Sequence, residues 1–485
     1  MESSLNSRVV NATKWSAIAE ITAKISGPIV NILLARLLTP VQFGVVASIT
    51  IITSFADIFT DAGFQKYVIQ HEFGDKKTLN DYSDVAFTSN ATLSSIIYIL
   101  IFVFRYKLSK LIGCPEASTA LAIASLSVLC TAFSSIAVAR FRRDLDFKPL
   151  FYIRLGSSLI PLLITVPLAF LLKSYWAIVI GSVMQQLFIA IVSIIKSDYK
   201  PKVSFKISYF KKMLSFSAWN LCETLSIWFA GQANVFIVGS VLTSYYLGLY
   251  KTGMSTINSY MSIVTATMSP VLFSALSRSQ NDDKQFLNIF LKTQKTIALL
   301  VIPMGIGIFT YRNLAVELLL GSQWKEISNF VGVWALMSAL TITYSNTACE
   351  VYRGKGLPKI SFILQVLYMF LYIPVIYYTA HQSFEMLCIA SCLVRGVPII
   401  LDFFVLRTKF GISLLNIVKN TSIQFIAAAI MALFGHVAVR TCTGIVMQII
   451  SVLLCIIIYF GIIFCFPQMR VEYGGYLRVL KRHNR

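Results

Sequence analysis

Ionisable residues inside long apolar stretches are the part of this sequence that could do chemistry. A charged side chain at membrane depth is costly, so it normally faces a partner or a water-filled cavity. Cations in a hydrated cleft could bind the oxygens of a diphosphate through charge-assisted hydrogen bonds, and would select an anionic headgroup. The alternative is internal ion pairing, or snorkelling to the interface near span ends. Seven of the 42 Lys and Arg residues lie within such stretches: Lys24, Arg36, Arg154, Lys251, Lys292, Lys295 and Arg395.

Acidic residues lie in the same kind of setting. Asp57 and Asp61 are four residues apart, so both lie on one face of a helix, and Glu20 stands in the same relation to Lys24. Internal ion pairing is the structural alternative to a role in transport. Glu223, Glu350 and Asp402 also lie in or beside apolar stretches.

The composition predicts that these charges sit in a membrane protein. The chain has 485 residues, of which 56% are hydrophobic and 13% charged, whereas a soluble domain carries about 25% charged residues. Apolar runs recur along the chain, and the longest approach the ~20 residues that cross a hydrocarbon core as a helix. The runs are apolar at both odd and even positions, which excludes the alternating pattern of a transmembrane β-barrel. We therefore expect an all-α, polytopic membrane protein with about fourteen transmembrane helices.

The basic residues are distributed unevenly between alternate loops. With fourteen spans placed by hydropathy, 28 of the 42 Lys and Arg residues fall in the loops and termini of one side and 7 in those of the other. The positive-inside rule then puts both termini in the cytoplasm. This asymmetry explains the net charge of +21 without a nucleic-acid partner. We interpret the basic loops first as a topology signal and second as a surface for lipid phosphates.

A duplicated segment divides the sequence into two halves. The stretch 31–44 (NILLARLLTPVQFG) is echoed by 235–248 (VFIVGSVLTSYYLG) at an offset of 204 residues. An even number of spans between equivalent positions predicts parallel repeats, related by an axis along the membrane normal. We expect two pseudo-symmetric six-helix lobes with a cleft between them, over 1–200 and 201–415, joined by a basic cytoplasmic linker over 196–212. Two extra transmembrane helices and a basic tail occupy 416–485.

Proline and glycine predict mobility in the first span. Pro28 follows Ser26 and Gly27. Proline removes the backbone hydrogen bond to the carbonyl of Lys24 and kinks the helix there. We therefore predict a hinge at Gly27 and Pro28.

Enzymatic and metal sites are not indicated by any motif. The sequence contains no phosphate-binding loop of the Gly-x-x-x-x-Gly-Lys-Ser/Thr type, so ATP is not predicted to be its energy source. Its four histidines are far apart, and its nine cysteines show neither metal-ligand nor disulfide-framework spacing. We expect neither an enzyme nor a cofactor. A membrane glycan polymerase or ligase is less favoured, because the predicted external connections are all short.

Several segments resemble one family of membrane transporters. The stretch 34–44 (LARLLTPVQFG), followed by 61–66 (DAGFQK), is similar to the opening signature of the polysaccharide transporter family, the oligosaccharide or O-antigen flippases. Further matching segments are 140–148, 248–250, 270–278 and 319–324. The resemblance spans essentially the whole chain, and its nearest branch is that of colanic-acid exporters.

This resemblance implies a fold, a substrate and a set of residues. It implies the multidrug/oligosaccharidyl-lipid/polysaccharide flippase superfamily, alternating access, and an undecaprenyl-diphosphate-linked oligosaccharide moved to the outer leaflet of a bacterial cytoplasmic membrane. The polysaccharide polymerase machinery is the expected partner. The cavity cations would include Lys24, Arg36 and Lys251. Ion gradients would supply energy, which makes the carboxylates Asp57, Asp61, Glu20, Glu223 and Glu350 candidates for ion coupling. A cation-coupled multidrug exporter of the same superfamily remains the main alternative.

Overall fold

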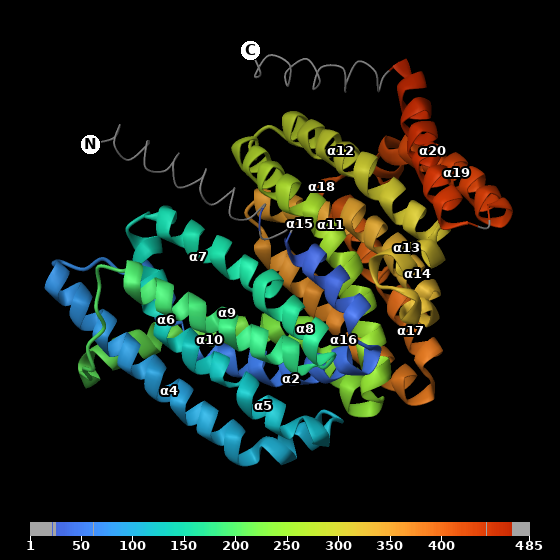
Figure 1. Ribbon diagram of the computed structural model, residues 1–485. Helices are drawn as coiled ribbons and strands as arrows, with labels where there is room; N and C mark the ends of the chain where they lie inside the picture. The colour runs from blue at the N-terminus through green and yellow to red at the C-terminus, as the bar shows by residue number, and fades with distance from the viewer. Residues whose placement is uncertain (1–21, 23–25, 62, 443, 468–485) are drawn as a thin grey trace, which may run out of the picture. The chain divides into compact units, whose positions relative to one another are not determined.

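The chain is described in two compact units, which are treated separately. The computed structural model describes residue 22 and residues 26–61, 63–442 and 444–467 (Figure 1). Unit 1 comprises residues 1–252 and unit 2 residues 253–485. All regular elements in the described part of the chain are helical, which confirms the expected fold class. The lobe boundaries predicted above, at residues 200 and 415, stay a prediction.

Unit 1 is a bundle in which α6 packs against α4 and α9, and α2 packs against α10. A helical segment over Ser26–Leu37 precedes α2, so the predicted hinge at Gly27 and Pro28 lies at the start of the described helix. The helices are α2 (Pro40–Asp61), α3 (Phe64–Gln70), α4 (Lys76–Leu111), η1 (Pro115–Ala117), α5 (Ser118–Ala124), α6 (Leu126–Arg143), α7 (Phe147–Ile160), η2 (Pro161–Thr165), α8 (Val166–Leu172), α9 (Trp176–Lys196), α10 (Ile207–Val241) and the first turns of α11 (Ser244–Arg278).

Unit 2 is organised around α12, which packs against α14 and α19, while α19 packs against α20. Small residues of α19, Ala427 and Ala428, are fully buried and allow the close helix approach that membrane packing favours. After α11 the helices are α12 (Asp283–Thr310), α13 (Arg312–Leu319), η3 (Ser322–Ile327), α14 (Ser328–Thr341), η4 (Ile342–Asn346), α15 (Thr347–Gly354), α16 (Pro358–Gln382), α17 (Phe384–Val394), α18 (Val397–Phe410), α19 (Leu414–Thr441) and α20 (Ile445–Cys465).

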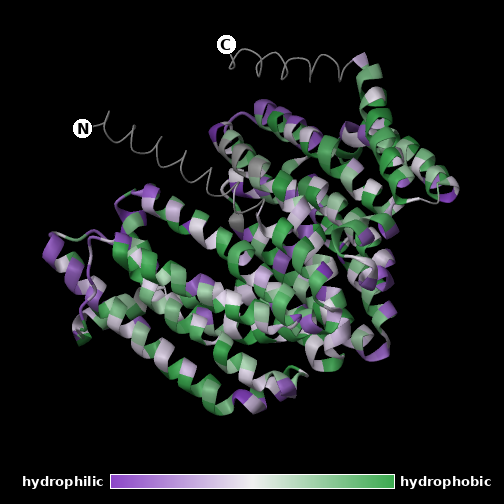
Figure 2. Ribbon diagram, in the orientation of Figure 1, coloured by the Kyte–Doolittle hydropathy of each residue, from purple (hydrophilic) through white to green (hydrophobic). Residues whose placement is uncertain are grey.

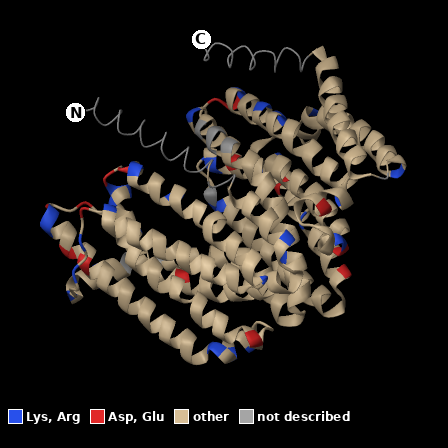
Figure 3. Cartoon of the chain, viewed as in Figure 1, with Lys and Arg blue, Asp and Glu red and all other residues tan. Residues whose placement is uncertain are grey.

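Twelve described helical segments are long and apolar enough to cross a membrane. Figure 2 shows hydrophobic residues along most of the helices, and Figure 3 shows charged residues chiefly at helix ends and in loops. Large apolar side chains are exposed, such as Phe370 at 74% and Val446 at 70%, which requires lipid as the solvent. The expected total of fourteen is not confirmed. The segment Ser26–Leu37 is described over only part of the first predicted span, and α11 is long but is not among the twelve apolar segments.

Side-chain caps begin several helices where the chain enters a span. Asp75 accepts a hydrogen bond from the backbone nitrogen of Thr78 at 2.8 Å and starts α4. Asp282 does the same for Gln285 at the start of α12. These caps satisfy N–H groups that the helix itself leaves without partners. The side-chain and backbone hydrogen bonds from Thr78 also hold the pKa of Asp75 below its ordinary value.

The duplicated glycines form a reciprocal contact within unit 1. A methyl group on Gly44 of α2 would overlap the carbonyl oxygen of Ser244 of α11, and a methyl group on Gly248 would overlap the carbonyl oxygen of Pro40. The offset of 204 relates Pro40 to Ser244 and Gly44 to Gly248. The repeat therefore brings the first turns of two equivalent helices into backbone contact, because glycine lets helices approach that closely.

We predict that a side chain at either glycine destabilises the protein. Gly44→Leu or Gly248→Leu must separate α2 from α11, and overpacking of this kind costs about 1–3 kcal/mol or more. Thermal unfolding of the purified chain in detergent should show a lower Tm for each variant. Gly461→Ala is the control, because a Cβ atom there meets no other atom within 4 Å. Equal Tm values for all three variants would refute the close contact.

Candidate functional site

The structure places the predicted cations in both units. Lys24 and Glu20 lie outside the described residues, and the side chains of Asp61 and Glu223 are also not described. Because the two units are described separately, the convergence of these cations on one cleft stays a prediction. The side chains of Arg36, Arg154 and Lys292 are exposed, whereas Lys251, Lys295 and Arg395 are half-buried.

Arg36 and Arg395 have contrasting surroundings. Arg36 lines a pocket of about 570 Å³ whose other walls are apolar side chains of α8 and of the helical segment Ser26–Leu37, including Leu37 and Phe170. The guanidinium carbon of Arg395 lies 4.2 Å from the ring centroid of buried Trp334. A cation held over an aromatic face in this way is stabilised by the ring quadrupole. Arg395 therefore has a structural contact within its own unit, in addition to its predicted role.

Glu350 is buried and forms an ion pair with Arg353 at 3.4 Å, one turn further along α15. The Arg353 side chain is 55% exposed, so the pair is at the edge of the bundle. Internal ion pairing, which is the structural alternative to a role in transport, is therefore observed for Glu350. Its predicted role in ion coupling is not tested by this contact.

Asp57 lies in a polar pocket inside unit 1. The pocket has a volume of about 350 Å³ and is lined by residues of α2, α5, α6 and α9. The carboxylate lies beside the hydroxyl of Thr131, which donates to the carbonyl of Ser127 at 3.0 Å, and the Oδ1 atom of Asp57 is buried without a partner among the described residues. The sequence singled out Asp57 as a carboxylate in an apolar run. It did not reveal Thr131 or Gln186, because polar residues of these types are common in membrane helices.

Asp402 in unit 2 is a buried carboxylate that is held by hydroxyl groups. Its two oxygens accept hydrogen bonds from Ser345 (2.5 Å) and Tyr352 (3.0 Å). Ser345 belongs to the π-helical turn η4, in which the backbone widens. The sequence identified Asp402 as a charge in a span, but it gave no sign of the π-turn that brings Ser345 to it.

The turn η4 connects three neighbouring helices through successive residues. The carbonyl of Thr343 accepts a hydrogen bond from Gln294 of α12 at 3.4 Å. The hydroxyl of Tyr344 bonds that of Thr421 of α19 at 2.8 Å, and Ser345 bonds Asp402 of α18. A π-turn leaves backbone groups that neighbouring side chains must satisfy. These hydrogen bonds hold η4 in place against α12, α19 and α18 of unit 2.

The predicted linker is bound to α4 in unit 1. The hydroxyl of Tyr199 donates to Asp84 at 2.5 Å, and the ammonium of Lys206 pairs with Asp81 at 2.6 Å. Burial, together with the hydrogen bond and charge of Asp84, raises the pKa of Tyr199 above its ordinary value. The basic stretch between the predicted lobes is thus attached to one unit through several side chains.

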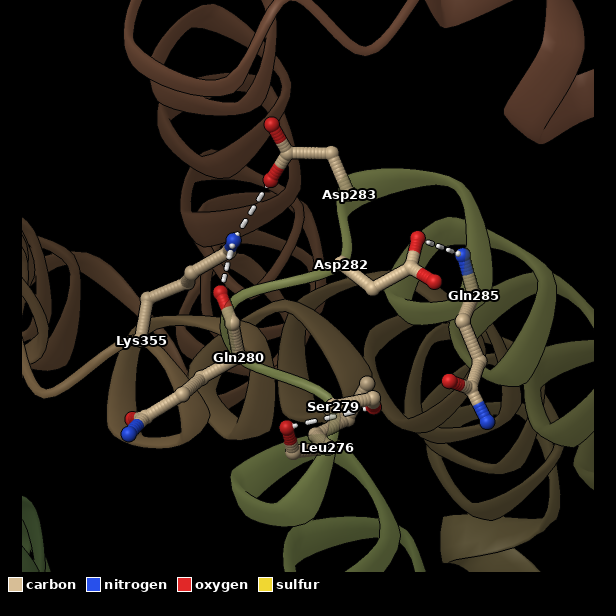
Figure 4. A network of polar contacts seen from close by, with 7 residues as sticks. All are labelled: Leu276, Ser279, Gln280, Asp282, Asp283, Gln285 and Lys355. Atoms are coloured by element: carbon tan, nitrogen blue, oxygen red, sulfur yellow. Dashed lines mark hydrogen bonds and ion pairs between the residues drawn. The ribbon is translucent and has the colours of Figure 1, made fainter.

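Basic residues of the loops hold backbone carbonyls in both units. In unit 1, Arg143 donates to the carbonyls of Val68 (2.7 Å) and His71 (2.6 Å) at the end of α3. In unit 2, Lys355 donates to the carbonyl of Gln280 and to Asp283, both at 2.7 Å (Figure 4). Both cations come from loops that are rich in Lys and Arg. They satisfy carbonyls that a helix end or turn leaves without partners.

Comparison with known proteins identifies the family. Residues 33–329 match the family model described as "Polysaccharide biosynthesis protein". This match covers more than half of the chain, so the chain belongs to this family, which confirms the resemblance inferred from the sequence. It is a multi-pass membrane protein of that family. Among the described residues, no group of three or more His, Cys, Asp or Glu side chains is placed to hold a metal ion.

Relatives and solved structures agree with this assignment. The chain is 24% identical over 432 residues to a membrane protein in the cps region of Klebsiella pneumoniae, covering 87% of each chain. It is 20% identical to the lipopolysaccharide biosynthesis protein WzxC of Escherichia coli, covering 83% of this chain and 82% of that one. Its fold is similar to that of the lipid II flippase MurJ in an inward closed conformation, with a TM-score of 0.75, 17% identity, and coverage of 94% and 99%. An inward-facing MATE multidrug transporter of the MOP superfamily has a TM-score of 0.58, 13% identity, and coverage of 80% and 94%.

We predict that Arg143→Ala loosens the end of α3. The substitution leaves the carbonyls of Val68 and His71 without their charged donor, and hydrogen bonds to charged groups contribute about 1.5–3 kcal/mol. Hydrogen exchange of the peptides covering 64–75 should become faster, with a lower Tm. The matched control is Arg142→Ala, which removes one exposed hydrogen bond to Gln65. Similar hydrogen exchange in both variants would contradict the role of Arg143 in holding the end of α3.

Proposed function

We propose that this chain is a flippase that moves an undecaprenyl-diphosphate-linked oligosaccharide from the cytoplasmic to the outer leaflet by alternating access. In this proposal it lies in the bacterial cytoplasmic membrane with both termini in the cytoplasm. The product would enter assembly of a surface polysaccharide such as O-antigen, capsule or exopolysaccharide, alongside the polymerase machinery. The single observation that carries the proposal is the family match over residues 33–329.

The relatives support the substrate class. They include WzxC, a lipopolysaccharide biosynthesis protein, and ExoT of Rhizobium meliloti, a succinoglycan biosynthesis transport protein that is 26% identical over 335 residues. Both names refer to the biosynthesis of a saccharide-containing polymer or lipid. The fold is also similar to that of the lipid II flippase MurJ. A transporter of saccharide units on a polyprenyl carrier accounts for both observations.

The chemistry of the spans suits an anionic headgroup. A lipid diphosphate carries negative charge into a region where water is scarce, so it needs fixed cations. Lys251 is half-buried on α11, and Arg36 lies beside an apolar pocket in the same unit. In the proposal these two residues and Lys24 bind the diphosphate, while Arg154, Lys292, Lys295 and Arg395 extend the cationic surface. Gly27 and Pro28 provide the hinge of the first helix.

An apolar pocket in unit 2 suits the polyprenyl chain. It has a volume of about 380 Å³ and is lined by α12, α19 and α20, with Pro303, Met431 and Ile456 among its walls. Its walls are almost entirely apolar, so an isoprenoid chain would lose no hydrogen bonds on entering it. Helices α19 and α20 lie outside the duplication, which gives the two extra helices a role in lipid handling under this proposal.

The main alternative is a cation-coupled multidrug exporter of the same superfamily. The MATE-like fold is compatible with it, but fold alone does not assign a substrate. A drug exporter should bind small amphipathic cations, which lipid diphosphates would not displace. A polymerase or ligase would change the covalent product, whereas a flippase would leave the oligosaccharide intact.

Reconstitution into liposomes tests the proposed function. A labelled polyprenyl-diphosphate oligosaccharide is placed in the inner leaflet of vesicles containing the full chain. A flippase should make the label accessible to an external reagent faster than in empty vesicles, with the molecule unchanged by mass spectrometry. Equal rates with and without protein, in the presence and absence of an ion gradient, would reject the proposal.

We predict that removing the cations slows flipping. Lys24→Ala, Arg36→Ala and Lys251→Ala each remove a charge-assisted contact worth about 1.5–3 kcal/mol, so each should slow transfer by about tenfold or more. Lys107→Ala is the matched control, because its ammonium is exposed beside the ring of Phe104. Wild-type rates in all three variants would reject the cationic cleft even if the flippase assay itself succeeded.

A further inference from the structure

A groove between α14 and α17 of unit 2 combines an apolar floor with carboxylates. It has a volume of about 410 Å³, and its walls come from these two helices and the end of η3. Phe330 and Cys392 are buried in the floor, whereas the carboxylates of Glu326 and Glu385 are exposed at the wall. Among the described residues, no Lys, Arg or His side chain lines the groove.

The two helices that form the groove run side by side in the same direction. Glu326 and Glu385 both act electrostatically on Cys388, which places the two carboxylates near each other. Further along both helices, the hydroxyl of Thr341 donates to the carbonyl of Arg395 at 3.3 Å. The starts of α14 and α17 therefore meet at one end of the groove, and their later turns meet at the other.

The groove consequently has a polar end and an apolar end that opens to lipid. Asn329 and Met337 on α14 are eight residues apart, as are Glu385 and Leu393 on α17, which corresponds to about 12 Å of helix. Ile389 is 57% exposed and Leu393 67% exposed. Because the helical segment Phe384–Phe410 is apolar enough to cross a membrane, these two side chains face acyl chains.

Both carboxylates stand where a helix begins. Glu385 lies in the first turn of α17, and Glu326 precedes the first turn of α14. An acidic residue at a helix start is favoured by the helix dipole. The dipole explains the residue type, but it does not explain why both carboxylates line one end of the same apolar groove.

Cations lie just beyond the carboxylates. The Nε atom of Arg312 donates to Oδ1 of Asn329, which lines the groove, at 2.7 Å. A guanidinium has five N–H donors, so its other donors can contact a ligand. Lys325 precedes Glu326, and its ammonium pairs with Glu317 at 3.3 Å with 57% of the side chain exposed. The polar end thus presents negative groups inside the groove and positive groups beside it.

We propose that this groove binds a phospholipid whose headgroup carries a primary ammonium, as in phosphatidylethanolamine. The ammonium contacts Glu326 and Glu385, and the phosphate faces Arg312. A primary ammonium donates three charge-assisted hydrogen bonds, which carboxylate oxygens accept. A groove of about 410 Å³ holds the headgroup end and the upper part of one acyl chain, so the rest of the lipid stays in the bilayer.

The arrangement of charges discriminates between lipid headgroups. Phosphatidylglycerol has no positive charge to meet the two carboxylates, so its phosphate is repelled by them. Phosphatidylcholine has a positive charge, but its trimethylammonium group has no N–H to donate. Only a primary ammonium supplies both the charge and the hydrogen-bond donors that Glu326 and Glu385 can use.

Lipid binding in this groove does not rest on the proposed function. It is measured without any saccharide, so its failure leaves the flippase assay untouched. Failure of the flippase assay would likewise leave the lipid-binding result intact.

Native mass spectrometry of the purified full chain tests the site. The chain in detergent is titrated with phosphatidylethanolamine, phosphatidylcholine and phosphatidylglycerol that carry identical acyl chains, and the Kd of the first bound lipid is measured. Phosphatidylethanolamine should bind about threefold more tightly or better than the other two, as expected for exposed ion pairs. The double variant Glu326→Gln/Glu385→Gln should lose this preference, because both amides are neutral.

Two further variants make the test specific. Glu116→Gln neutralises an exposed carboxylate in unit 1 and should keep the full preference. Ile389→Trp fills the groove but keeps both carboxylates, so it should weaken phosphatidylethanolamine binding, which also serves if the double variant does not fold.

Three outcomes would overturn the proposal. The first is an equal Kd for the three lipids, or tighter binding of phosphatidylglycerol, in the unmodified chain. The second is a preference that persists in Glu326→Gln/Glu385→Gln. The third is unchanged binding in Ile389→Trp, because the lipid would then lie outside the groove.

Discussion

A polar group carried into a lipid bilayer has to be satisfied by the protein itself, and the described structure is organised by this constraint. The backbone meets it by forming helices. Hydroxyl side chains meet it by donating to carbonyls of the preceding turn, as Thr50 and Ser182 do. Where a helix widens at η4, successive residues are bonded by α12, α19 and α18. The same constraint makes the buried Oδ1 atom of Asp57 an exception, because it is a polar atom for which the described chain provides no hydrogen-bond partner.

The duplication in the sequence repeats packing positions but does not repeat every charged position. Gly44 and Gly248 are equivalent in the repeat and make reciprocal backbone contacts. At the same offset of 204, however, Asp57 corresponds to buried Met261. The glycines are repeated because, at each of these positions, a helix needs a residue without a side chain to approach its neighbour closely. A charge at membrane depth is costly, so it is retained only where it has a use.

The basic loops combine two roles that the sequence could not separate. Their excess of Lys and Arg predicts topology, since cytoplasmic loops carry such an excess. In the structure, Arg143 and Lys355 also bind carbonyls of neighbouring turns, and Lys206 and Tyr199 attach the predicted linker to α4. A loop cation can do both, because topology depends on how many Lys and Arg residues a loop carries, whereas binding a carbonyl depends on the position of one side chain.

The sequence alone determined the all-helical membrane class, the duplication and the family. Hydropathy, loop charge and the order of motifs can all be read along the chain without knowing which helices are in contact. It also singled out Asp57 and Glu350, since a carboxylate in an apolar run is conspicuous. Only the tertiary structure decided what surrounds them: Glu350 pairs with Arg353, whereas Asp57 lines a pocket whose other polar residues include ones from helices distant in sequence. It likewise revealed the contact of Gly44 with Ser244 and of Asp402 with Ser345. Such pairings depend on which faces of the helices meet, and apolar faces of similar composition do not specify that from sequence.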